Sequence, residues 1–154
     1  MLFYSLAAIV FFIDHFLKNM VQHAMQVGQS IPVLDGIVKL TYVRNTGAAF
    51  SLFTGYSAYL VVIGVLATAV ILYFHFKVPR RHIYSQIALA FILGGSIGNL
   101  FDRISLGFVV DYIDFGFWPV FNLADIMINV GVIMIAAHIL TEDKRGKDDV
   151  ADLI

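Results

Sequence analysis

Residues 56–76, YSAYLVVIGVLATAVILYFHF, run for 21 positions without a single Asp, Glu, Lys or Arg. A helix that crosses a membrane needs roughly 20 mostly apolar residues, so this stretch predicts a transmembrane helix. Residues 83–101 also lack all four charged residue types, and residues 115–140 contain only Asp125. A small soluble domain could not bury so much apolar surface, and we therefore expect an integral membrane protein.

The first predicted span is less uniform than the others. Residues 2–13 are uncharged but too short to cross a membrane alone, so the helix should continue through Asp14 and Lys18. The segment has neither a basic start nor a small-residue cleavage site, which favours a retained helix over a cleaved signal peptide. We expect a single domain of residues 1–141 with four transmembrane helices, at about residues 2–22, 56–76, 83–102 and 122–140.

Composition excludes several classes of protein. Only 14% of the 154 residues are charged and 60% are hydrophobic, whereas soluble domains have about 25% charged residues. The net charge of −1 offers no basic field for nucleic acid. The absence of cysteine excludes thiolate metal sites and a cysteine nucleophile. The five histidines show no metal-binding spacing, and neither a metal nor a cofactor is expected.

The positions of Lys and Arg predict the orientation, because cytoplasmic loops are enriched in both residues. Six of them lie in the 77–82 loop and in a charged tail of residues 142–154. On the other side only Lys39 and Arg44 are clear of the helix ends, with Lys18 and Arg103 close to those ends. We therefore expect both termini, and the tail, in the cytoplasm. Residues 23–55 and 103–121 should then face outward.

Residues of about 28–54 predict a small extracytoplasmic β-sheet. Asp35-Gly36 is a turn signal, residues 37–43 partly alternate between apolar and polar, and Asn45-Thr46-Gly47 forms a second turn signal. The expected fold class is a membrane all-α bundle of four transmembrane helices that carries this sheet. Aromatic residues on the same side are expected to form an interfacial belt: Phe108, Tyr112, Phe115, Phe117 and Trp118.

Several residues at the helix ends predict helix packing and buried ion pairs. Asp14 and Lys18 are four residues apart on one helix and can pair. Gly94 and Gly98 form a G-x-x-x-G pattern, which allows a second helix backbone to approach closely. As a structural hypothesis, Asp14 and Lys18 form one neutral network with Asp102 and Arg103.

Four carboxylates, Asp102, Asp111, Asp114 and Asp125, lie at the same predicted outer interface. Asn122 and Asp125 also have the spacing of a helix-capping box, which is a purely structural role. Two carboxylates in close contact share a proton, and such a pair can activate water to attack a peptide carbonyl. The spacing does not reveal which upstream acid would partner Asp125.

Other functions have weaker support in the sequence. A Ser–Lys dyad that uses Lys18 or Lys39 has no local motif. A transporter subunit would need carboxylates along a route across the bilayer, but here they gather on one side. A membrane transferase would usually have an acidic metal motif facing the cytoplasm, and none is present.

Five motifs in this order resemble the bacterial lipoprotein signal peptidases, also called signal peptidase II, over nearly the whole chain. The motifs are Asp14-x-x-x-Lys18, RNTGAAFS at 44–51, GGSIGNLFDR at 94–103, GFVVDY at 107–112 and FNLAD at 121–125. The resemblance implies an aspartic endopeptidase that cleaves diacylglyceryl-modified prolipoproteins just before the lipidated cysteine. It also implies four transmembrane helices with an extracytoplasmic β-cradle.

The resemblance further assigns roles to individual residues. It implies that Asp111 and Asp125 are the catalytic pair. It implies supporting or substrate-binding positions at Asp14, Lys18, Asn45, Gly47, Asn99, Asp102, Arg103 and Asn122. The expected partners are lipid-modified prolipoproteins and membrane lipids, and the expected state is a monomer in the bacterial plasma membrane. The family is the target of the cyclic peptide antibiotic globomycin.

Overall fold

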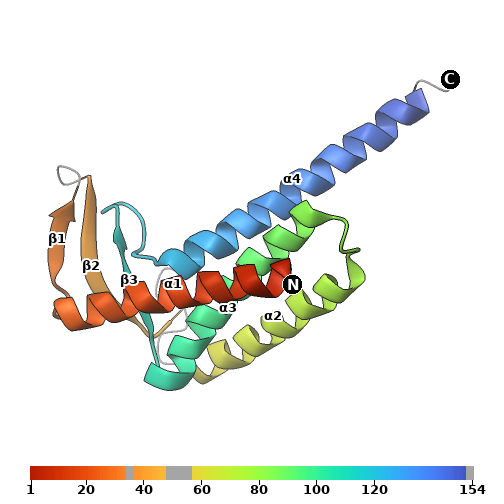
Figure 1. Ribbon diagram of the computed structural model, residues 1–154. Helices are drawn as coiled ribbons and strands as arrows, with labels where there is room; N and C mark the ends of the chain where they lie inside the picture. Colours follow the sequence, from red (N-terminus) through yellow and green to blue (C-terminus); the bar gives the residue numbers. More distant parts are fainter. Residues whose placement is uncertain (34–36, 48–56, 152–154) are drawn as a thin grey trace.

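The computed structural model describes residues 1–33, 37–47 and 57–151. Four helices and three strands follow one another along the chain (Figure 1): α1 (Leu2–Ala24), β1 (Ser30–Val33), β2 (Val38–Asn45), α2 (Ser57–Lys77), α3 (Ile83–Leu106), β3 (Val109–Asp114) and α4 (Leu123–Ala151). The predicted turn at Asp35-Gly36 and the end of the RNTGAAFS motif, from residue 48, lie outside the described residues.

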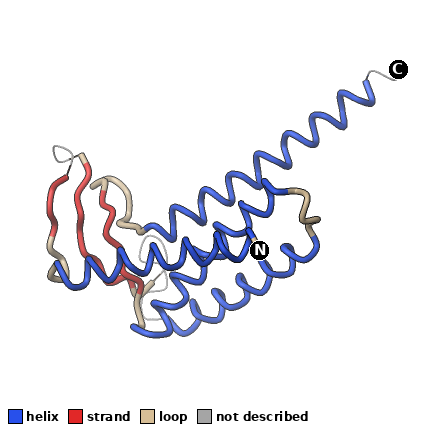
Figure 2. The backbone as a smooth tube through the Cα atoms, viewed as in Figure 1, coloured by secondary structure: helices blue, strands red, loops and turns tan. Residues whose placement is uncertain are grey.

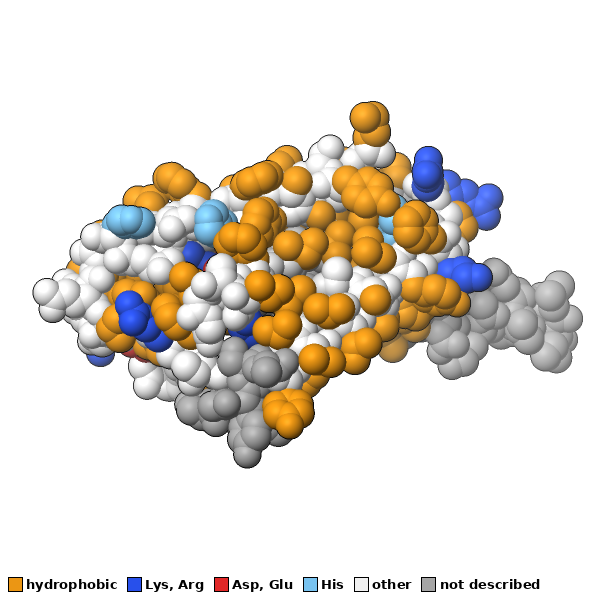
Figure 3. Space-filling model, turned by 90° about the horizontal axis from the view of Figure 1, so that it is seen from below, with side chains coloured by type: hydrophobic (Ala, Val, Ile, Leu, Met, Phe, Trp, Pro, Cys, Tyr) orange, Lys and Arg blue, Asp and Glu red, His pale blue; other side chains and the backbone are white. Residues whose placement is uncertain are grey.

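All four helices are long and apolar enough to cross a membrane, over Leu2–Ala24, Tyr59–Lys77, Ile83–Leu106 and Leu123–Thr141. Apolar side chains cover the middle of the face in Figure 3, and Lys and Arg appear toward its two ends. A surface of this kind is stable in lipid, where an exposed apolar side chain costs nothing. The expected fold class, a four-helix membrane bundle with a small sheet, is confirmed.

Two helices, α3 and α4, extend by four residues or more beyond their predicted ends. α3 continues to Leu106, where Gly107 adopts a left-handed conformation with φ of 81° and ends the helix. α4 continues as helix to Ala151, through most of the segment predicted as a tail, and projects past the other helices (Figure 1). Seven of the ten residues from 142 to 151 are charged, and the Glu, Lys and Arg among them favour helix.

α3 is the central helix of the bundle and packs against α1, α2 and α4. Small residues allow this close packing. A Cβ atom on Gly94 would lie 2.7 Å from the carbonyl oxygen of Ala7 in α1, and one on Gly98 would lie 2.6 Å from the Asp14 carboxylate. The predicted close approach of a second helix at Gly94 and Gly98 is confirmed, and that helix is α1.

The three strands form an antiparallel sheet in the order β1-β2-β3, at one end of the bundle (Figure 2). The predicted sheet of residues 28–54 is incomplete, because the third strand is β3, which follows α3. The register places Val43 opposite Asp111 and Asn45 opposite Val109. The end of α1 packs on the sheet through a buried cluster that includes Val21 and Tyr112.

The predicted aromatic belt is correct only in part. Phe117 and Trp118 are exposed, as interfacial anchors would be. Tyr112, in contrast, is buried, because every residue from Val109 to Tyr112 on β3 is covered by neighbouring elements.

Replacing Gly94 by Ala should destabilise the bundle, because the new methyl group would meet backbone in α1 that cannot move aside easily. We expect a loss of about 1–3 kcal/mol, measured as a lower thermal midpoint in detergent micelles. Gly64→Ala is the matched control, since its methyl group would meet only the flexible end of Leu100, at 3.0 Å. Equal losses in the two variants would contradict the close packing of α1 on α3.

Candidate active site

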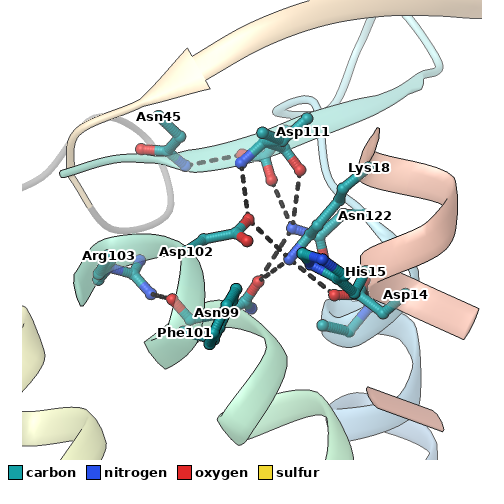
Figure 4. Close-up of polar contacts among 12 residues, drawn as sticks. Asp14, His15, Lys18, Asn45, Asn99, Phe101, Asp102, Arg103, Asp111 and Asn122 are labelled. Carbon is teal, nitrogen blue, oxygen red and sulfur yellow. Dashed lines mark hydrogen bonds and ion pairs between the residues drawn. The ribbon is translucent and has the colours of Figure 1, made fainter. Parts of the chain in front are cut away.

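Asp111 lies on β3 and is only 2% exposed. Two asparagine side chains hold its carboxylate from different elements (Figure 4). Asn45 Nδ2, at the end of β2, donates to Asp111 Oδ2 at 2.8 Å, and Asn122 Nδ2 donates to Asp111 Oδ1 at 2.6 Å. The β2–β3 pairing therefore brings together a motif at residue 45 and a motif at residue 111.

Asp125 lies in the first turn of α4 and forms a complete capping box with Asn122. The Asp125 backbone N–H donates to Asn122 Oδ1 at 3.0 Å, and the Asn122 backbone N–H donates to Asp125 Oδ2 at 3.2 Å. The predicted capping role is confirmed. Asn99 Nδ2 donates to the other carboxylate oxygen of Asp125 at 2.7 Å, which fixes the whole group.

Asn122 and Asn99 each have one amide orientation in which their side-chain oxygen and nitrogen match the donors and acceptors around them. Asn122 Oδ1 accepts from the Asp125 backbone, so its Nδ2 faces Asp111. Asn99 Nδ2 faces Asp125, so its Oδ1 accepts from Lys18 Nζ at 2.9 Å and from Asn122 Nδ2 at 3.1 Å. The two amides thus connect both aspartates to Lys18.

Lys18 is 1% exposed and forms ion pairs with Asp14 at 2.8 Å and with Asp102 at 3.1 Å. Asp14 also accepts from the Ala124 backbone N–H at 2.8 Å, at the start of α4. Asp102 accepts from the Val110 backbone N–H at 3.2 Å, next to Asp111. This network joins α1, α3, β3 and α4, and its three charged side chains are all buried.

The predicted network is confirmed for Asp14, Lys18 and Asp102, but Arg103 does not join their ion pairs. Adjacent residues on a helix point in different directions. Arg103 instead donates to the backbone oxygens of Asn99 at 3.3 Å and of Gly47 at 3.2 Å. It fastens the loop after β2 to α3.

Both aspartates line a cavity of about 900 Å³ next to the sheet. Six of the ten predicted site residues line it: Asn45, Gly47, Asn99, Arg103, Asp111 and Asp125. The other four are buried behind it: Asp14, Lys18, Asp102 and Asn122. Asp114 is not at the cavity, since its carboxylate accepts from Thr41 Oγ1 and from the Gly116 backbone, and these bonds lower its pKa.

Two walls of the cavity are formed by segments that were not predicted as site residues. One wall is the loop of residues 118–121, and the other is a face of α4 that contains Ile126, Asn129, Val130 and Ile133. Helical spacing could have indicated Asn129, because residues four apart share a face and Asp125 precedes it by four. In the loop, the sequence indicated Trp118 only as an interfacial aromatic residue and Phe121 only as the start of the FNLAD motif.

Burial and, to a lesser extent, the nearby charge of Asp125 together raise the pKa of Asp111 to about 7, against the opposing hydrogen bonds of Asn45 and Asn122. A carboxyl group with this pKa is partly protonated at neutral pH. Two carboxylates in one cavity, one of which retains a proton, can act together as general acid and general base. Within the described residues, no group of three or more His, Asp or Glu could hold a metal ion.

Comparison with known proteins identifies the family of this chain. The sequence profile of a family described as signal peptidase (SPase) II matches residues 6–141. The chain belongs to the signal peptidase II family. The lipoprotein signal peptidase of Desulfitobacterium hafniense is 42% identical over 146 residues, which cover 94% of this chain and 97% of that one. The protein of the same name from Halothermothrix orenii is 38% identical over 143 residues, which cover 93% of this chain and 98% of that one.

Solved structures show the same fold. Two of them, each described as a bacterial membrane enzyme, superpose with TM-scores of 0.86 and 0.81 at 30% and 32% sequence identity. The first alignment covers 91% of this chain and 88% of the other, and the second covers 88% and 90%. Membership of the signal peptidase II family makes this chain a peptidase and a multi-pass membrane protein.

Replacing Lys18 by Met should destabilise the fold strongly, because two buried carboxylates would lose their counter-charge. Removing one partner of a buried ion pair costs about 3–5 kcal/mol, measured here as the fall in free energy of unfolding in micelles. The exposed Lys39→Met is the matched control and should change stability by less than about 0.5 kcal/mol.

The triple variant Asp14→Asn, Lys18→Met, Asp102→Asn separates charge from packing. Because no uncompensated charge remains, it should recover much of the stability that Lys18→Met loses. A triple variant no more stable than Lys18→Met would show that Lys18 acts through packing alone.

Proposed function

We propose that this protein is an aspartic endopeptidase that removes the signal peptide from diacylglyceryl-modified prolipoproteins by cleaving just before the lipidated cysteine. The observation that carries the proposal is the joint position of Asp111 and Asp125 at one cavity, linked through Asn122. The relatives named lipoprotein signal peptidase support the substrate class.

In the proposed mechanism, a water molecule held between the two carboxyl groups attacks the scissile carbonyl carbon. Asp125 takes a proton from this water, and Asp111 gives its proton to the carbonyl oxygen, which yields a neutral tetrahedral intermediate. The peptide C–N bond then breaks as Asp125 returns its proton to the leaving nitrogen and Asp111 recovers the proton of the hydroxyl group. No covalent bond to the enzyme forms.

The assignment of the acid to Asp111 rests on its surroundings. Asp111 is almost fully buried and has a pKa of about 7. Asp125 is less buried and lies at the N-terminus of α4, where the helix dipole stabilises a negative charge. The surroundings of Asp111 therefore favour it as the member of the pair that carries the proton.

The walls of the cavity suit a substrate that lies in the membrane. Ile126, Val130 and Ile133 form an apolar face of α4, and Ile133 is also open to the lipid side. A signal helix and its neighbouring acyl chains could enter along this face and leave the peptide bond at the carboxylates. In this arrangement Trp118 and Phe121 border the cavity on the side of the sheet.

We place the sheet and the cavity on the extracytoplasmic side of the bacterial plasma membrane, with both termini in the cytoplasm. The excess of Lys and Arg at the opposite end supports this orientation. We further propose that the protein acts as a monomer, without a cofactor, and that globomycin inhibits it.

The test is incubation of the purified protein with a lipidated prolipoprotein and with the same prolipoprotein unlipidated. Wild-type protein should cleave only the lipidated form. Asp111→Asn and Asp125→Asn should each lower kcat by about 10²- to 10⁴-fold, because each removes a proton-transfer group.

Asp114→Asn is the matched control, since Asp114 lies on the same strand as Asp111 but away from the cavity. It should retain nearly full activity. Full turnover by either Asp111→Asn or Asp125→Asn would refute the dyad, and equal cleavage of both substrates would refute the proposed specificity.

A further inference from the structure

A second cavity, of about 290 Å³, lies at the end of the bundle opposite the sheet. It forms where α1 begins and where α2 leads into α3. Its lining residues include no acid: Met1, Leu2, Phe3, Tyr4, His75, Arg80, Ile83 and Gln86. None of the residues proposed for peptide cleavage is near it in the fold.

His75 is 7% exposed and its protonation pattern follows from its neighbours. Gln86 Nε2 donates to the backbone oxygens of Val78 at 2.9 Å and of His75 at 3.3 Å, so Gln86 Oε1 is an acceptor. That oxygen lies 2.6 Å from His75 Nδ1, which must therefore carry the hydrogen. In the neutral ring Nε2 is then a hydrogen-bond acceptor, and it has no partner among the described residues.

The rest of the lining supplies hydrogen-bond donors. The guanidinium of Arg80 is exposed and forms no ion pair or hydrogen bond with the part of the chain that the structure describes. α1 begins at Leu2 without a side-chain cap and without an acidic residue in its first turn. The free N–H groups of such a helix end, together with a guanidinium, favour an anion.

The ring of Phe3 stacks on His75 with centroids 3.6 Å apart, which holds the imidazole at the cavity wall. Leu2, Tyr4, Phe76 and Ile83 are exposed at the same end. A ligand bound here would thus meet polar groups within the cavity and apolar side chains along the bundle surface. A lipid has a polar headgroup for the cavity and acyl chains for the apolar surface, whereas a free anion has only the polar group.

We propose that this cavity binds the headgroup of phosphatidylglycerol. Arg80 and the start of α1 bind the phosphate, and His75 Nε2 accepts a hydrogen bond from a glycerol hydroxyl group. The acyl chains lie along the exposed apolar side chains. The lipid would tie α1 to the α2–α3 loop at the end of the bundle opposite the sheet.

The test is native mass spectrometry of the purified full-length protein, titrated with phosphatidylglycerol, phosphatidic acid or phosphatidylcholine. Wild-type protein should bind one phosphatidylglycerol more tightly than phosphatidylcholine. Arg80→Gln should weaken both anionic lipids about tenfold, because it removes a charge-assisted contact to the phosphate. Arg81→Gln, which removes the same charge from the same loop but not from the cavity, should change affinity less than about twofold.

His75→Asn tests the hydroxyl contact, since its amide can still donate to Gln86 but lacks a group at the Nε2 position. It should weaken phosphatidylglycerol and leave phosphatidic acid, which has no glycerol hydroxyl group, nearly unchanged. Peptidase activity equal to that of the wild type would show that each variant is folded.

Three results would overturn the proposal. Equal weakening by Arg80→Gln and Arg81→Gln would mean diffuse attraction to surface charge. An equal effect of His75→Asn on both anionic lipids would exclude the hydroxyl contact. Displacement of the lipid by free glycerol phosphate at the same concentration would mean that the site binds a soluble phosphate.

Discussion

The buried ammonium group of Lys18 connects the parts of this structure that hold the two central aspartates. It contacts the carboxylates of Asp14 and Asp102 and the side-chain oxygen of Asn99. Through these groups it reaches the start of α4, the start of β3 and the carboxylate of Asp125. A buried ammonium group is stable only while acceptors and opposite charges surround it, so the elements that carry its partners have little freedom to shift.

The close packing of α3 makes this arrangement possible. Gly98 leaves room for the Asp14 carboxylate, and Gly95 lies against the backbone of Ala124 at the start of α4. A larger residue at either position would push α1 or α4 away from α3. Gly98 and Gly95 therefore serve the site as well as helix packing, because they leave room for the Asp14 carboxylate and for the start of α4.

Much of the fold follows from sequence patterns that depend on local physics. The uncharged run at 56–76 and the turn signals near Asn45 predicted the spans and the sheet, because apolar length and turn chemistry act over short distances. The third strand was not predicted, since β3 pairs with β2 across more than 60 residues. The capping box of Asn122 and Asp125 was local and was predicted, whereas the amide links from Asn45 and Asn99 are long-range contacts. The resemblance to a family named the site residues, but only the structure divides them between the cavity and the buried network.

The central claim is that this environment keeps a proton on the aspartate pair at neutral pH, with Asp111 as its main carrier. Infrared difference spectra of the wild type and Asp111→Asn, recorded from pH 5 to pH 9, test this directly. Because the pKa of Asp111 is raised to about 7, the carbonyl band of a protonated carboxyl group should be present at pH 5 and disappear with a midpoint near 7. The band should be absent from Asp111→Asn. A band that is already lost at pH 5, or one that persists in Asp111→Asn, would contradict the account.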